Sequence, residues 1–145
     1  EGAGSPAYQR VTYQRYDDYG NLVQYRSNDN GVVTTILWAH NGMYPVARVD
    51  NATFAEVATA LGVAESTLMG LNDQNLQVID NIRTTLPDKV IFTYKVLPLV
   101  GFTKTTDPNG LTTEYIYDAE NRLYQIKDQD GNTLRQFEYN YGSNN

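Results

Sequence analysis

The segment 107–132 limits the fold of this chain more than any other part of the sequence. It places turn residues around short stretches in which apolar or β-branched residues alternate with polar ones. Gly110 accepts positive φ, and Pro108 fixes φ near the value that a turn requires. Every second residue from Leu111 to Tyr117 falls on one face, as in a half-buried strand. The segment therefore predicts antiparallel hairpins.

The N-terminal part of the chain repeats this spacing. Tyr16, Asp17, Gly20 and Leu22 are spaced as Tyr117, Asp118, Asn121 and Leu123 are. Gly31 stands seven residues before Trp38, and Gly110 stands seven residues before Tyr117. Gly131 follows Gly110 after 21 residues. This length suits a repeat of two strands. We interpret these residues as structural turn positions of a repeat, and we predict positive φ at Gly20 and Asn121.

Residues 110–123 resemble the YD repeat of the Rhs family, which is also found in teneurins. The family pattern is roughly Gly-x-x-Thr-x-Tyr-x-Tyr-Asp-x-x-Gly-Arg-Leu, followed by an Asp-Gly or Asn-Gly turn. This sequence departs from the pattern at Asn121, where the family has glycine. The first copy keeps Gly20 but has Asn21 where the family has arginine. Segments 44–45, 51–56 and 93–101 are similar, more loosely, to surface Rhs proteins of gut Bacteroidetes.

The resemblance implies a fold, a location and partners. Rhs proteins are long bacterial proteins, secreted or displayed at the cell surface, whose repeats wind into a β-sheet spiral or shell. In some relatives the shell encloses a C-terminal toxin. The resemblance therefore implies a non-catalytic scaffolding segment whose partners are adjacent repeats of the same parent chain.

Between the two repeat-like blocks, the apolar pattern changes to a helical period. Thr53 and Glu56 form a capping box, in which each side chain bonds the other residue's amide. Gly62 ends the first helix, and Pro87 ends the last. Seven residues are expected in the core: Phe54, Val57, Leu61, Leu68, Leu71, Ile79 and Ile82. We predict an α+β fold, an antiparallel hairpin sheet with an insertion of about three helices.

Five segments follow from these patterns. They are a flexible N-terminal end (1–7), a first strand block (8–51), the helical insertion (52–87), a second strand block (88–141) and a C-terminal tail (142–145). As a segment of a longer repeat protein, the isolated fragment would keep unpaired strand edges near residues 8–16 and 133–141. Such edges are templates for another chain, so we expect edge-to-edge self-association of the isolated fragment.

Composition argues against several functions. The net charge is −6, with 11 basic and 17 acidic residues, and the isoelectric point is about 4.6. An acidic chain does not suit nucleic acid or an anionic lipid surface as a partner. The sequence has no cysteine, which excludes disulfides and thiolate chemistry. No apolar run approaches the roughly 20 residues of a membrane span, so membrane insertion is not expected.

No motif predicts catalysis, a cofactor or a metal. His40 is the only histidine, and no Ser or Cys nucleophile motif lies nearby, so we interpret it as a turn residue. Asp128 and Asp130 are ordinary turn residues, and the glutamate that ends a calcium loop is missing. Asp107 precedes a proline, but the sequence around an aspartyl autoprocessing site is absent. We therefore expect no enzyme activity.

Carbohydrate binding is the alternative function. Tyr115, Tyr139 and Tyr141 could stack on the sugars of a cell-surface glycan, because an aromatic ring offers an apolar face with a polar rim. The same rings suit sheet packing. In addition, residues 54–72 resemble the helical half of a LysM peptidoglycan-binding module. The helical period of residues 74–86, where that module has a closing strand, argues against this second resemblance.

Overall fold

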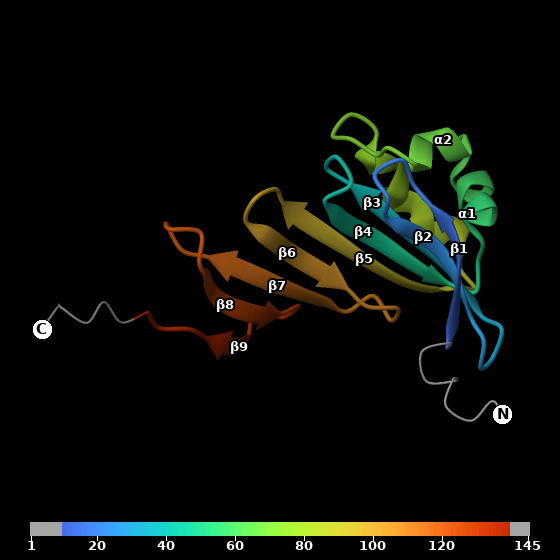
Figure 1. Cartoon of the computed structure of the whole chain (residues 1–145). Helices are drawn as coiled ribbons and strands as arrows, with labels where there is room; N and C mark the ends of the chain where they lie inside the picture. Colours follow the sequence, from blue (N-terminus) through green and yellow to red (C-terminus); the bar gives the residue numbers. More distant parts are fainter. Residues whose placement is uncertain (1–9, 140–145) are drawn as a thin grey trace, which may run out of the picture. The chain divides into compact units, whose positions relative to one another are not determined.

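The computed structural model describes residues 10–139, and these residues form mainly β-structure (Figure 1). The described part contains nine strands and a few short helical segments. It divides into two compact units, one ending at Thr93 and one beginning at Tyr94. The predicted end segments 1–7 and 142–145 lie outside the described residues. No helix within the described part is both long enough and apolar enough to span a membrane.

The first unit is a five-stranded antiparallel sheet. Its strands pair in the order of the chain. They are β1 (Val11–Tyr16), β2 (Leu22–Ser27), β3 (Val33–Ala39), β4 (Tyr44–Asp50) and β5 (Val90–Leu97), the last of which continues into the second unit. The predicted antiparallel hairpins are therefore confirmed.

The helical segments of the first unit lie between β4 and β5 and cover one face of its sheet (Figure 1). They are α1 (Phe54–Leu61), α2 (Glu65–Leu68), η2 (Leu76–Asn81) and α3 (Ile82–Thr85). Only α1 has more than two turns, and the third helix expected over 74–86 is a 3₁₀ segment followed by a four-residue helix. The α+β prediction thus overstated the helical content.

Local signals determine where α1 begins and ends. The Thr53 hydroxyl accepts from the Glu56 amide at 3.1 Å, and the Glu56 carboxylate accepts from the Thr53 amide at 2.8 Å. This is the predicted capping box. Gly62 ends the helix at φ 72°, a left-handed value that suits glycine. The side chain of Gln24 in β2 accepts from the Phe54 amide at 2.7 Å, which ties the first turn of the helix to the sheet.

The hydrophobic core lies between this sheet face and the helices. Cross-strand partners such as Leu37 and Ala47 are fully buried together with Phe54 of α1. Six of the seven predicted core residues are buried. The prediction was wrong for Leu61, which is only half-buried. It is the last residue of α1 and contacts the core without being enclosed by it.

The second unit consists of strands without a buried core in its described residues. Its further strands are β6 (Gly101–Thr106), β7 (Thr112–Tyr117), β8 (Leu123–Asp128) and β9 (Thr133–Gln136). They pair antiparallel in the order of the chain. No residue between Tyr94 and Tyr139 is buried in this structure. The order of this unit therefore depends on strand pairing, turns and half-buried side chains.

Candidate functional site

Four turns within residues 10–139 share one hydrogen-bond pattern. Each begins with an aspartate: Asp17, Asp107, Asp118 or Asp128. One carboxylate oxygen accepts from the amides two and four residues later, at 2.8–3.0 Å. In the main chain, the aspartate amide donates to the carbonyl four residues later, and its carbonyl accepts from the amide three residues later. The carboxylate thus satisfies donors that a tight turn would otherwise leave unpaired.

The fourth residue of each turn has positive φ. The values are 85° at Gly20, 84° at Gly110, 62° at Asn121 and 85° at Gly131. The positive φ predicted at Gly20 and Asn121 is therefore confirmed, and asparagine is the side chain that best tolerates this region after glycine.

The equivalence predicted for Gly31 holds only in part. Gly31 also has positive φ, 74°, but its amide donates to the carbonyl of Ser27, four residues earlier. The corresponding donation from Gly110 goes to Asp107, three residues earlier. The turn before Gly31 is thus one residue longer, and serine replaces the aspartate.

Asp107 and Asp128 were not recognised from the sequence as members of the same set. Both stand three residues before a glycine, as Asp17 does, and this Asp-x-x-Gly spacing could have identified them. The carboxylate of Asp128 accepts from the amides of Asp130 and Asn132. Within residues 10–139, no group of three or more side chains is placed to hold a metal ion.

The strand pairs beside two of these turns end in the same way. Tyr16 of β1 pairs with Leu22 of β2, and Tyr117 of β7 pairs with Leu123 of β8. A register shift precedes the closing pair in both cases. The two blocks identified in the sequence as repeats therefore share the closing tyrosine–leucine pair as well as turn geometry. Further from the turn their registers differ, because β1 and β2 have a second shift, between Tyr13 and Arg15.

In the described part of the chain, the side chains of Trp38, Tyr117 and Tyr139 each donate back to a main-chain carbonyl near the start of the preceding strand. Trp38 donates to Leu22 at 2.9 Å, Tyr117 to Phe102 at 2.8 Å, and Tyr139 to Leu123. The acceptor lies 16, 15 and 16 residues before the donor, respectively. We call this the aromatic–carbonyl contact. It fastens the end of one strand, or the chain just after that strand, to the first residues of the preceding strand.

Gly101 makes room for one of these contacts. Its φ is 146°, and a β-carbon built on it would lie 2.7 Å from the hydroxyl oxygen of Tyr117. That hydroxyl donates to the carbonyl of the next residue, Phe102. A side chain at position 101 would therefore compete with the Tyr117 hydroxyl for the same space.

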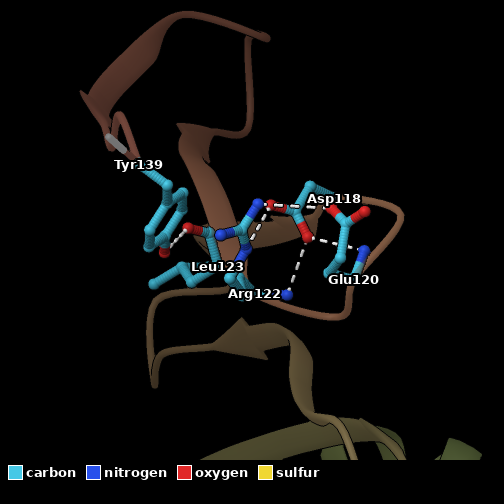
Figure 2. Close-up of polar contacts among 5 residues, drawn as sticks. All are labelled: Asp118, Glu120, Arg122, Leu123 and Tyr139. Atoms are coloured by element: carbon cyan, nitrogen blue, oxygen red, sulfur yellow. Dashed lines mark hydrogen bonds and ion pairs between the residues drawn. The ribbon is translucent and has the colours of Figure 1, made fainter. Parts of the chain in front are cut away.

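Arg122 connects a turn with an aromatic–carbonyl contact (Figure 2). Its guanidinium donates to Asp118 at 2.9 Å and to Glu120 at 3.2 Å. The same guanidinium lies over the ring of Tyr139, 4.2 Å from the ring centroid. Figure 2 shows Tyr139 reaching the Leu123 carbonyl beside this arginine. The cluster thus holds the turn, the start of β8 and the chain after β9 together.

The remaining candidates are placed as follows. His40 has φ 57° in the turn after β3, and its imidazole lies 3.4 Å from the carboxylate of Asp73. Tyr115 is half-buried in β7, and Tyr139 is exposed but carries the Arg122 guanidinium on its ring. Tyr141, the third residue proposed for glycan stacking, lies outside the described residues.

Comparison with known proteins agrees with this geometry. Residues 103–133 match the sequence model of the family described as RHS Repeat. The match runs from β6 to the start of β9 and includes the turns at Asp107, Asp118 and Asp128. The chain therefore contains a repeat of the Rhs, or YD-repeat, family. No curated protein matches the chain.

The turn at Asn121 provides a direct test of the shared geometry. Asn121→Gly is expected to be neutral or to stabilise the chain by up to about 1 kcal/mol, because glycine adopts positive φ freely. Asn121→Val is expected to destabilise by about 1–3 kcal/mol, because a β-branched side chain resists that region. Urea unfolding followed by far-UV circular dichroism measures both. Equal stabilities of the two variants would contradict the assigned role of position 121.

The turns also predict a pH dependence. The Arg122 amide, with that of Glu120 and the Arg122 side chain, lowers the pKa of Asp118 below its ordinary value of 3.8. The Asn132 amide and side chain do the same for Asp128. Because these hydrogen bonds favour the ionised form in the folded state, their stabilisation is present above about pH 3.8 and is lost as the pH falls through the lowered pKa.

This dependence is measurable by nuclear magnetic resonance. The amide shifts of Glu120 and Arg122 should titrate together, with a midpoint below 3.8. In Asp118→Asn, which keeps an acceptor oxygen without the charge, this titration should disappear. A midpoint at or above 3.8 in the parent chain would refute the proposed hydrogen-bond effect.

Proposed function

We propose that this chain is a non-catalytic structural segment of a bacterial surface or secreted Rhs protein, in which successive hairpins extend an antiparallel sheet. The observation that carries the proposal is the recurrence of one turn and one aromatic–carbonyl contact along strands that pair in chain order. Such a unit can be repeated without limit, because each hairpin offers an edge to the next.

The lack of buried residues among those described in the second unit supports a scaffolding role. A sheet whose residues are at most half-buried gains little from a core of its own. Neighbouring repeats of the parent chain would pair with its edge and cover more of its surface. The match of residues 103–133 to the RHS repeat also supports an extracellular location, where a shell could hold a toxin as cargo.

Edge pairing can be tested with the isolated chain. The weight-average mass in analytical ultracentrifugation should rise above the 16.3 kDa monomer over a hundredfold concentration range. Leu134→Pro in β9 should weaken the association, because proline removes an edge amide. Leu134→Thr keeps the amide and should associate more than the proline variant does. A monomer at every concentration would count against exposed, pairing-competent edges.

Carbohydrate binding is the second proposal, carried by the exposed ring of Tyr139 and the half-buried ring of Tyr115. A glycan array tests it with the parent chain and with Tyr115→Ala and Tyr139→Ala. Binding by the parent that both variants lose would favour a glycan ligand over scaffolding alone. The absence of binding would leave the scaffolding proposal in place.

A further inference from the structure

The turn between β5 and β6 carries a group of apolar side chains that we call the apolar tip. It consists of Leu97, Pro98, Leu99 and Val100, and the Val100 amide closes the turn by donating to the Leu97 carbonyl at 3.0 Å. The side chain of Leu99 is 85% exposed, and that of Leu97 is 49% exposed. These side chains therefore add little to the apolar area that the fold buries.

The backbone conformation of Leu99 is unusual for a leucine. Its φ is 69°, in the left-handed region that disfavours residues with a branched or bulky side chain. Leu99 stands third in the turn, after Pro98, where glycine or asparagine is the usual residue. The exposed side chain does not offset this strain by burial. Such an outlier suggests a function for the side chain outside the described fold.

The charge near the apolar tip differs from that of the chain as a whole. Residues 89–106 contain Lys89, Lys95 and Lys104, three of the four lysines in the sequence, and no acidic residue, whereas the net charge of the chain is −6. Lys95 is exposed and stands two residues before the tip. Lys104 stands four residues after it and pairs with Glu114 of β7. The tip thus has an exposed cation beside it in its own hairpin.

We propose that the apolar tip inserts into the interface of a lipid bilayer, with Leu99 in the acyl boundary and the Lys95 ammonium group at the phosphate layer. A convex apolar tip needs no matching cavity in a fluid interface, whereas a protein partner would have to supply a pocket. The stem of a lysine can lie along apolar surface while its charged end stays in water.

This proposal is compatible with the acidic composition of the chain. The net charge argues against adsorption of the whole chain on anionic lipid, but insertion of apolar side chains does not depend on that charge. The tip enters only the interface, so no membrane-spanning segment is required. The proposal goes beyond scaffolding, because it gives the sheet a point of attachment, and it does not depend on pairing between repeats.

A dye attached at the tip tests the proposal in the full chain. Because the sequence has no cysteine, Leu99→Cys accepts a polarity-sensitive dye at a single position. Leu111→Cys is the matched control, since Leu111 is 51% exposed in the turn that follows β6. The probes are phosphatidylcholine vesicles with and without phosphatidylglycerol. Sedimentation of the unlabelled chain with the same vesicles measures the bound fraction.

The expected result is that vesicles shift the emission of the dye at position 99 to shorter wavelength and leave that at position 111 unchanged. Leu99→Asn should lower the association constant for vesicles about tenfold, because the inserted apolar side chain is lost. Its urea midpoint should not fall, since asparagine tolerates positive φ better than leucine does. Leu111→Asn should change binding less than about twofold, and phosphatidylglycerol should raise binding about fivefold through Lys95.

Three outcomes would overturn the proposal. The first is that the parent chain binds neither kind of vesicle. The second is an equal loss of binding in Leu99→Asn and Leu111→Asn, which would indicate adsorption without a preferred site. The third is a shift of the dye at position 99 with rising chain concentration and no lipid, which would mean that the tip binds a second copy. The scaffolding proposal stands in each case, because it depends on strand edges and not on this turn.

Discussion

Replacing Phe54 by alanine is expected to lower the free energy of unfolding of the first unit by about 3–5 kcal/mol. Phe54 is the largest fully buried side chain of the core, and it stands at the first position of α1, where the helix joins the sheet. Its removal leaves a cavity in a closely packed core and also removes the ring over which the Arg15 guanidinium lies, 4.8 Å from the ring centroid. Urea unfolding followed by the fluorescence of Trp38 measures the loss.

Leu61→Ala is the matched control in the same helix. Because Leu61 is half-buried at the end of α1, its truncation should cost clearly less than that of Phe54. Similar losses for the two variants would mean that the core extends over the end of α1. A loss below about 1 kcal/mol for Phe54→Ala would mean that the helices contribute little to the stability of the sheet.

Replacing Gly101 by alanine should destabilise the second unit by about 2–4 kcal/mol. Two effects contribute: a residue with a β-carbon at φ 146° costs about 1–3 kcal/mol, and the displaced Tyr117 hydroxyl loses a hydrogen bond worth about 1 kcal/mol. Hydrogen exchange at the amides of β6 and β7 follows the change without interference from the first unit.

Two controls separate the strain from the lost contact. Gly131 has φ 85°, and a β-carbon added there would have no other atom within 4 Å, so Gly131→Ala reports strain alone. Tyr117→Phe removes the hydroxyl alone. In the Tyr117→Phe background, Gly101→Ala should cost about 1 kcal/mol less than in the parent chain, because the hydrogen bond is already gone. Strict additivity of the two changes would show that Gly101 does not make room for this contact.

Interactions close in sequence could be predicted, and interactions distant in sequence could not. The capping box at Thr53 and Glu56 and the turn from Asp118 to Asn121 join residues three or four apart, so the spacing of side-chain types identifies them. The aromatic–carbonyl contacts were missed because their acceptors are main-chain carbonyls. Every residue has one, so no side-chain pattern marks Phe102 or Leu123 as an acceptor.

Burial was predicted correctly for residues in the middle of an apolar helix face. It was missed where burial depends on how far the neighbouring elements extend. The apolar stripe of α1 identified Phe54 and Val57, but the same stripe gave no sign that the core stops short of Leu61. The alternation in β7 indicated a half-buried strand. The described residues of the second unit include no helix that could cover this strand. The alternation could not predict this, because a covering helix would be encoded in another part of the sequence.

The position of the helical segments has a consequence for how such sheets can diversify. β4 and β5 pair as direct neighbours, with Asp50 opposite Val90, although the whole of residues 51–89 connects them. Each doubling of a connection adds only about 0.6 kcal/mol to the entropy of closing it, and a connection that buries its own apolar side chains offsets that cost. A hairpin of this kind can therefore acquire a new module at its loop while its register stays the same, and the number of strands and the number of modules can evolve independently.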